Sequence, residues 1–209
     1  MTHKEFDPST LSRLDQSKLI AGAVVPRPIA FVTTSGSSGI NAAPFSYFNV
    51  ACVEPPVLMF SISVPTTRRV GTVKDTLQNL REAPECVIHI VSHDIREAMN
   101  FCAAEHARDV DELSESGLTA IPSRMVRPPR IAECPVAFEC AVQHILPVGQ
   151  IPYHLVLAEV LWMHFRDDIV NERLHVDAAT MDPIARLAAA GSYARITDSF
   201  VMPLPREAL

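Results

Sequence analysis

No apolar run in this 209-residue sequence approaches the ~20 residues that a helix needs to cross a bilayer. The segment from Met1 to Asp15 is polar, so it lacks the apolar centre of a secretory signal. No internal repeat with a period of roughly 20 to 50 residues is visible. We therefore expect a cytoplasmic protein that has no membrane partner.

Cysteine pairs are also lacking, because the five cysteines are an odd number and none of them forms a CxxC motif. They are Cys52, Cys86, Cys102, Cys134 and Cys140. This pattern is typical of reduced, mostly buried thiols in a cytoplasmic protein. Nucleophilic catalysis by a Cys–His pair stays open, although no cysteine has sequence neighbours that would clearly lower its pKa.

Several motifs with known chemistry are missing. The sequence has no GxGxxG after a strand, no GxxxxGK[ST] and no GxSxG, which excludes a Rossmann site, a Walker phosphate loop and a hydrolase elbow. The eight histidines form no HExxH and no zinc spacing with cysteine. His89 and His93 are separated by a strand end and a helix start, so we expect no metal site. The net charge of −6 argues against nucleic acid as the main partner.

Glycine is scarce and proline is abundant, with 7 and 17 residues. Proline is excluded from central strands and helix interiors, so many of these residues are expected at strand edges and in ordered loops. The 48% hydrophobic content supports one sizeable core. We expect residues 1–209 to form a single domain.

Alternating and β-rich runs predict about six or seven strands with interspersed short helices. Extended runs are expected at 29–34, 40–49, 57–64, 85–91, 137–145 and 153–165, with turns at 35–40 and 148–152. Helices are expected at 15–22, from 74 to before Pro84, at 94–104 and at 182–191. Residues 105–117 are interpreted as a polar surface segment. Since neighbouring strands are joined by hairpins, a mainly β fold, an antiparallel Greek-key barrel with peripheral helices, is favoured over a doubly wound parallel sheet.

The stretch 27–76 contains most of the residues that could bind a ligand. Pro26 and Pro28 stiffen the backbone around Arg27, which either meets an anionic group or lies solvated on a strand edge. Asp75 is a plausible N-cap of the helix near residue 75, where free backbone N–H groups favour an anion. Hydroxyls, amides, stiff prolines and a few cations, including Arg68-Arg69, suit a phosphate-bearing organic cofactor that itself supplies the reactivity.

The sequence resembles the flavin reductase-like proteins of the FMN-binding split-barrel fold. These include flavoredoxin and the reductase components of two-component monooxygenases. The resemblance spans about residues 18 to 200. It rests on the segments 27–34, 41–49, Pro55-Pro56, 74–79, 111–112 with 116–118, 128–131, Glu139-Cys140, 185–187 and 191–193.

The resemblance implies a homodimer that binds one FMN per subunit near the subunit interface, with NADH or NADPH as hydride donor. The stretch 41–49 would line the isoalloxazine, with the backbone N–H groups of 46–49 near its polar edge. Ser61 and Ser63 would face the ribityl chain, and Lys74 and Thr76 would hold the phosphate. The expected cofactor-binding residues are Arg27, Asn41, Ala43, Pro44, Ser46, Tyr47, Phe48, Asn49, Ser61, Ser63, Lys74, Asp75 and Thr76.

These roles have structural alternatives. Phe45, Tyr47 and Phe48 suit core aromatics, and Lys74 suits a solvated helix start. Asn41 suits a left-handed position after Gly39. Ser61 and Ser63 suit the solvent-facing side of a strand. Gly191 and Tyr193 are second-rank candidates, because they suit a helix C-cap and a packed aromatic.

The sequence departs from the family pattern at two places. Ala158-Glu159-Val160 stands where a glycine often precedes Glu-Val. Ala188-Ala189-Ala190-Gly191 stands where Gly-Gly often follows Arg-Leu, which leaves the role of this tail open.

The function implied is an NAD(P)H:flavin oxidoreductase without a required side-chain acid or base. A hydride would pass from NAD(P)H to FMN, and the electrons would go on to free flavin or another acceptor, such as a partner monooxygenase. The alternatives are an FMN-binding electron carrier or sensor without NAD(P)H activity, and a split barrel that binds another ligand.

Overall fold

A computed structural model describes residues 1–37, 39–65, 71–107, 110–188 and 191–202. Its main feature is a seven-stranded sheet in the order β2-β1-β5-β8-β9-β4-β3, in which all neighbouring strands are antiparallel. These strands are β1 (Ala30–Gly36), β2 (Gly39–Phe45), β3 (Phe48–Val53), β4 (Pro56–Ile62), β5 (Glu85–Ile90), β8 (Val136–Val148) and β9 (Tyr153–Phe165). The expected mainly β, antiparallel split-barrel fold with peripheral helices is confirmed.

The remaining elements are short. The helices are η1 (Pro8–Thr10), α1 (Arg13–Ala23), α2 (Asp75–Glu82), η2 (His93–Ile95), α3 (Arg96–Phe101), α4 (Glu112–Glu115), η3 (Asp167–Ile169) and α5 (Ala178–Met181). Two small sheets pair β6 (Ala120–Ile121) with β7 (Arg130–Ile131) and β10 (Ile184–Arg186) with β11 (Tyr193–Arg195). Within the described ranges, no helix is long and apolar enough to cross a membrane.

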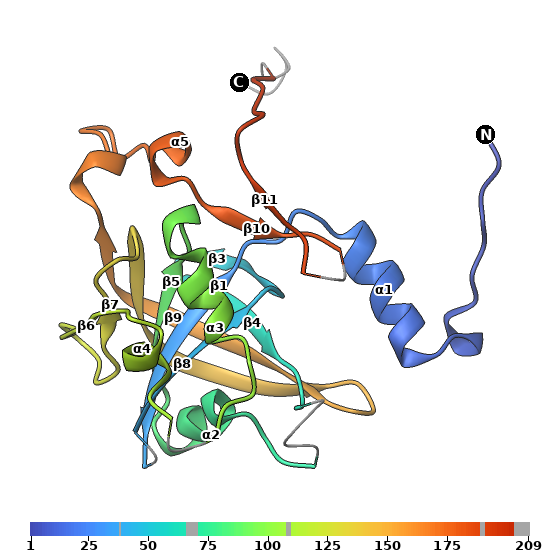
Figure 1. Cartoon of the computed structure of the whole chain (residues 1–209), viewed down its shortest axis with the longest axis horizontal. Helices are drawn as coiled ribbons and strands as arrows, with labels where there is room; N and C mark the ends of the chain where they lie inside the picture. Colours follow the sequence, from blue (N-terminus) through green and yellow to red (C-terminus); the bar gives the residue numbers. More distant parts are fainter. Residues whose placement is uncertain (38, 66–70, 108–109, 189–190, 203–209) are drawn as a thin grey trace.

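The barrel interior is filled from alternate positions of its strands. Val32, Phe60 and Ile88 pack there with Leu77 and Leu80 of α2, which covers one end of the barrel (Figure 1). Strand β1 is buried on both faces, because Phe31 points the other way into a second cluster beneath α3 and α4. Two buried faces explain why the first half of the strand, Ala30, Phe31 and Val32, is apolar without alternation.

The two edges of the sheet, β2 and β3, follow each other in the chain. Only Ser46 and Tyr47 separate them, and the Ser61 N–H donates to the Tyr47 carbonyl at 2.9 Å. The expected single extended run over 40–49 is therefore wrong, since the chain bends at these two residues and changes edge. This bend is where the barrel is split.

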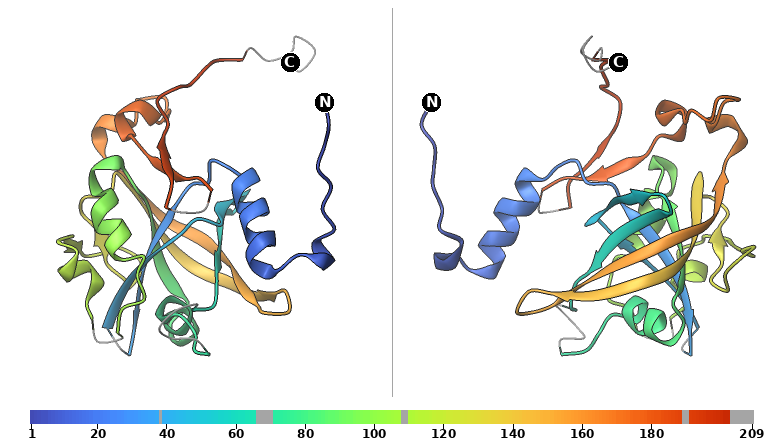
Figure 2. Two further views of the ribbon diagram at one scale, coloured as in Figure 1. Left: turned by 45° about the vertical axis from the view of Figure 1, so that its right-hand side comes forward. Right: turned by 180° about the vertical axis from the view of Figure 1, so that it is seen from behind.

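Helix α1 stands beside the barrel (Figure 2) and has no buried residue. It is longer than the short turn expected at 15–22, because Ser12 caps it: the Ser12 hydroxyl accepts a hydrogen bond from the Asp15 N–H at 3.1 Å.

Two further helix predictions need adjustment. The N-cap of α2 is Lys74, and Asp75 is the first residue inside the helix. The single helix expected at 94–104 is instead the short helix η2 followed by α3.

The helix expected at 182–191 is wrong where the structure describes it. Asp182 has a left-handed backbone (φ 47°), and strand β10 follows it. The Ile184 N–H donates to the Val91 carbonyl at 3.0 Å, and the Arg186 N–H donates to the Arg27 carbonyl at 2.8 Å. These long-range backbone bonds override the helix propensity of the alanine-rich segment. Ala189 and Ala190, like Arg68 and Arg69, lie outside the described residues.

Candidate functional site

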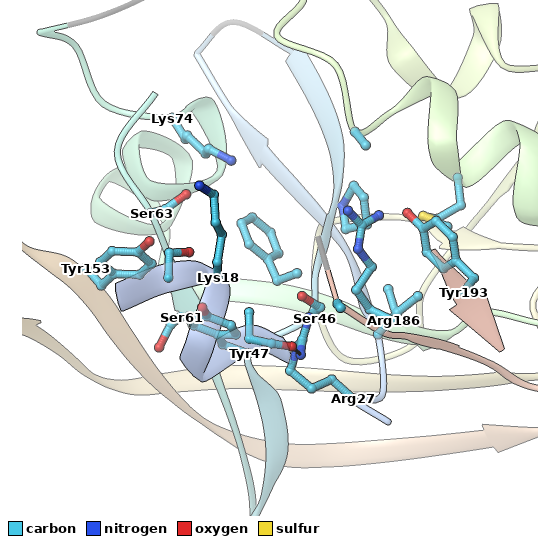
Figure 3. Close-up of a pocket in the computed structure, with 18 of the residues that line it drawn as sticks. Lys18, Arg27, Ser46, Tyr47, Ser61, Ser63, Lys74, Tyr153, Arg186 and Tyr193 are labelled. Atoms are coloured by element: carbon cyan, nitrogen blue, oxygen red, sulfur yellow. Dashed lines mark hydrogen bonds between the residues drawn. The ribbon is translucent and has the colours of Figure 1, made fainter. Parts of the chain in front are cut away.

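A cavity of about 360 Å³ opens at the split of the barrel (Figure 3). Its walls come from α1, from the bend between β2 and β3, from the end of β4, from the residue before α2 and from the β10–β11 hairpin. They comprise Leu14, Ser17, Lys18, Ala21, Arg27, Ile29, Pro44, Phe45, Ser46, Tyr47, Ser61, Ser63, Lys74, Met99, Ala103, Tyr153, Arg186, Ala188 and Tyr193. The volume is in the range of small-molecule and cofactor sites.

The charges in this wall have one sign. Lys18, Arg27, Lys74 and Arg186 line the cavity, and the described lining contains no aspartate or glutamate. In Figure 3, Lys18 and Lys74 point toward the same part of the cavity, beside Ser63, whereas Arg27 and Arg186 lie on its other side. A ligand that fills this cavity is therefore expected to be anionic.

Lys74 is more buried than Lys18. Burial lowers the pKa of its ammonium group below the ordinary value, and the nearby Glu105 opposes this shift. The Nζ atom lies 5.6 Å from the centre of the Phe45 ring. Lys74 is the N-cap residue of α2, and no side chain of the described residues caps this helix start. The positive end of the helix dipole therefore favours an anion beside Lys74.

Aromatic side chains form another part of the wall. The Tyr47 and Tyr153 rings are stacked, with their centroids 6.0 Å apart and their planes at 18°. The Arg13 guanidinium of α1 lies 6.0 Å from the Tyr153 ring centre. Both tyrosines line the cavity, so they offer a flat aromatic ligand apolar ring surface beside their hydroxyl groups.

The structure sorts the thirteen residues expected from the sequence into three groups. Those in the cavity are Arg27, Pro44, Ser46, Tyr47, Ser61, Ser63 and Lys74. A small adjoining cavity of about 50 Å³, which shares Pro44 and Lys74, is lined by Asn41, Ala43, Asp75 and Thr76. Two residues line neither cavity: Phe48 packs against the barrel core, and the exposed Asn49 accepts a hydrogen bond from the Val50 N–H at 2.8 Å.

Asn41 and Thr76 hold each other behind this wall. The Asn41 amide donates to the Thr76 hydroxyl at 3.0 Å, and both side chains are buried. Asn41 lies within β2, so the alternative of a left-handed turn position is wrong. The pair fixes α2 against β2 next to Lys74.

For Arg27 the alternative of a solvated position on a strand edge is wrong. The residue is 7% exposed, and its guanidinium donates to the carbonyls of Ala21, Val24 and Leu187 at 2.5, 2.6 and 2.7 Å. It thus ties the end of α1 to the chain after β10. Its Nε atom has no partner within the described part of the chain.

Sequence reasoning missed Lys18, Tyr153 and Arg186. Lys18 lies in a helix that was interpreted as a lead-in, and Arg186 in a segment expected to be helical. One sequence signal could have pointed to Arg186, namely an arginine followed seven residues later by Tyr193. In the structure the Arg186 guanidinium lies 4.7 Å from the centre of the Tyr193 ring.

Glu112 belongs to the segment that was interpreted as a polar surface, but the structure buries it. Its carboxylate accepts the Ala42 N–H at 2.7 Å and lines the small cavity with Thr76. Burial raises the pKa of Glu112 to about 7, although the Ala42 N–H and His106 lower it, and Asp75 and Asp111 add to the rise.

Replacing Glu112 with glutamine is expected to stabilise the protein at pH 8 by at least about 1 kcal/mol. The folded protein holds the Glu112 proton up to about pH 7, whereas an ordinary glutamate releases it near 4.5. The wild type therefore loses stability as the pH rises from about 4.5 to 7, and the E112Q variant lacks this loss. Urea unfolding at pH 4.5 and pH 8 measures it, and equal pH dependence in both proteins would contradict the expectation.

Two cysteines, Cys102 and Cys134, are not activated as nucleophiles. Burial raises the pKa of Cys102 to about 11 and also raises the pKa of Cys134 above its usual range. All five cysteines are free thiols, and Cys52 is the exposed one.

Comparison with known proteins shows a match to the flavin reductase like domain over residues 22–184. An uncharacterized protein of Aquifex aeolicus is 41% identical over 185 residues, which cover 88% of this chain and 89% of the relative. Among solved structures, nitrilotriacetate monooxygenase component B from Bacillus cereus is 30% identical, with a TM-score of 0.89 over 97% of this chain and 100% of the other.

The 2-nitrobenzoate 2-nitroreductase NbaA of Pseudomonas fluorescens is 31% identical, with a TM-score of 0.86 and 97% coverage of both chains. A flavoredoxin of Desulfovibrio vulgaris shares the fold at 17% identity, with a TM-score of 0.74 over 99% of this chain and 100% of the other.

Proposed function

The chain belongs to the flavin reductase like domain family, and from this premise we propose that it is an FMN-dependent NAD(P)H:flavin oxidoreductase. The observation that carries the proposal is the cavity at the split of the barrel. It is lined by basic side chains and stacked tyrosines, and by no carboxylate among the described residues. A phosphorylated, flat, polar ring system matches this combination.

The phosphate of FMN is assigned to the end of the cavity where Lys74, Lys18 and Ser63 converge. Lys74 supplies a partly desolvated ammonium group, and the first amides of α2 add dipoles of the same sign. Asn41 and Thr76 support this end from behind. Thr76 is only 1% exposed, so its side chain is assigned the role of positioning α2 rather than of contacting the phosphate.

The ring system is assigned to the part of the cavity beside the bend at Ser46 and Tyr47. The backbone groups of this bend are assigned to the polar edge of the ring, and Ser61 of β4 lines the same cavity. When bound, the flavin supplies the hydride-accepting chemistry of the reaction. The chain holds the ring in place and leaves one face accessible, so no side-chain acid or base is required.

The relatives support a role in electron delivery. Component B of a monooxygenase and a nitroreductase share this fold at about one third identity. We propose free flavin, or an acceptor protein such as a monooxygenase, as the recipient of the electrons. The free thiols fit a reducing cytoplasm, where NADH and NADPH are available.

We also propose that two copies associate. The edge strand β3 is exposed along most of its length, including Val50 and Val53, and α1 exposes Leu19 and Ile20. An uncovered edge with apolar side chains calls for a cover, and a second copy would supply it. Light scattering should give twice the 23.0 kDa chain mass, and a monomer at micromolar concentration would contradict the dimer.

The function is tested with the purified protein and FMN without oxygen. The expected result is a yellow protein, or one that turns yellow on adding FMN, whose absorbance is bleached by NADH or NADPH. A protein that binds no FMN contradicts the proposal. A protein that binds FMN but is reduced by neither nucleotide supports the electron-carrier alternative instead.

A further inference from the structure

Two arginines in the cavity wall face each other directly across a backbone bridge. Arg27 and Arg186 exchange both N–H···O bonds, at 2.9 and 2.8 Å, and are paired antiparallel. Both side chains line the cavity, on the side away from Lys18 and Lys74 (Figure 3). Like charges that stand directly opposite each other on paired strands are destabilising.

Repulsion between two like charges is usually offset by an acidic partner, which is lacking in the described part of the chain. Neither arginine forms an ion pair there, whereas Arg195, on β11, pairs with Asp182 at 2.7 Å. Arg27 is buried, and its guanidinium contacts carbonyl oxygens and the Tyr47 ring. Among the described residues its Nε atom has no hydrogen-bond partner. A buried guanidinium without an anionic partner is costly, so an anion at this end of the cavity would stabilise the protein.

The phosphate of FMN does not meet this need, because it is assigned to the opposite end. The second negative charge that a bound flavin can carry lies on its ring. Two electrons and one proton convert the oxidised ring into a monoanion whose charge is centred on N1 and the neighbouring carbonyl, and a further proton would cancel it. The ring is assigned to the bend at Tyr47, whose aromatic ring lies 5.8 Å from the Arg27 guanidinium.

We propose that Arg27 and Arg186 form a second anion subsite that favours the reduced, anionic flavin over the oxidised form. This inference rests on the proposed binding of FMN in the cavity. The subsite separates two tasks: the Lys18 and Lys74 end provides affinity for the phosphate in both redox states, and the arginine end makes the affinity depend on redox state.

The test compares the dissociation constants of oxidised and reduced FMN near pH 8 without oxygen, in the wild type and in three variants. R186M removes the charge at a half-buried position, R186K keeps it, and K74M removes a charge from the phosphate end. In R186M the ratio of the oxidised to the reduced dissociation constant is expected to fall at least about tenfold, a shift of about 30 mV for two electrons. R186K should keep the ratio within about threefold, and K74M should weaken both forms equally.

The wild type alone provides a second measurement with riboflavin, which has no phosphate. Reduced riboflavin is expected to bind at least about tenfold more tightly than oxidised riboflavin. Equal binding of the two forms, an unchanged ratio in R186M, or an equal loss in R186K and R186M would overturn the inference. The inference would also be overturned if R186M kept the wild-type ratio of the two flavin dissociation constants but bound NADH or NADPH more weakly. The arginines would then serve the second substrate. If no flavin binds at all, the proposed function fails as well, so the two failures are distinguishable.

Discussion

Replacing Lys74 with methionine is expected to weaken FMN binding by about 1.5–3 kcal/mol, or roughly 10- to 150-fold in Kd. Methionine preserves the apolar stem against Phe45 and the length of the side chain, but it removes the ammonium group from the phosphate end of the cavity. Burial already lowers the pKa of this ammonium group, and a phosphate at the site would stabilise its charged form. Fluorescence titration with FMN measures the change.

Two controls make the Lys74 result specific. Riboflavin should bind the K74M variant and the wild type with nearly equal affinity, since it carries no phosphate. The K4M variant, changed at an exposed lysine of the N-terminal segment, should bind FMN like the wild type. If K74M binds FMN normally, or loses FMN and riboflavin equally, the phosphate does not lie at Lys74.

Replacing Glu139 with alanine is expected to reduce the free energy of unfolding by about 3–5 kcal/mol. This fully buried carboxylate accepts the N–H groups of Arg124 and Met125 at 2.8 and 2.5 Å, and His164 Nε2 lies 2.7 Å away. Burial alone would raise the pKa of Glu139, but these amides and His164 outweigh it and hold the pKa below its ordinary value. Alanine would remove the acceptor of these three part-buried donors and leave a cavity in its place.

Urea unfolding measures this effect, and Glu159 provides the matched control. Glu159 lies on β9, the strand beside the β8 strand that carries Glu139. Its carboxylate accepts an exposed hydrogen bond from the Gln143 side-chain amide at 2.6 Å. The E159A variant is expected to stay within about 0.5 kcal/mol of the wild type. A loss below about 1 kcal/mol in E139A would show that the loop carrying Arg124 and Met125 is held by other contacts.

Much of the barrel was predictable because its strands bury one or both faces with strong periodicity. Val57–Val64 and Tyr153–Phe165 carry such patterns, and both correspond to strands within a few residues. The division of 40–49 at Ser46 and Tyr47 was not predictable, because the chain changes from one sheet edge to the other without a glycine or a break in polarity. Closure of the barrel, which is a long-range effect, decides that bend.

The site was predictable only where a single segment supplies it. Ser46, Ser61, Ser63 and Lys74 lie in the stretch that the sequence singled out, and the structure places them in one cavity. Lys18 and Arg186 come from segments before and far after it, and they reach the cavity through tertiary contacts alone. Arg186 was hidden further by the alanine-rich sequence after it, whose helical propensity is overridden by pairing with Arg27.

A crystal structure of the protein grown with FMN tests the central claim most directly. The expected result is a flavin at the split of the barrel, its phosphate oxygens within about 3 Å of Lys74 Nζ and its ring beside Ser46 and Tyr47. A flavin bound outside this cavity, for example between α3 and the β10–β11 hairpin, would contradict the claim, as would a phosphate at the arginine end.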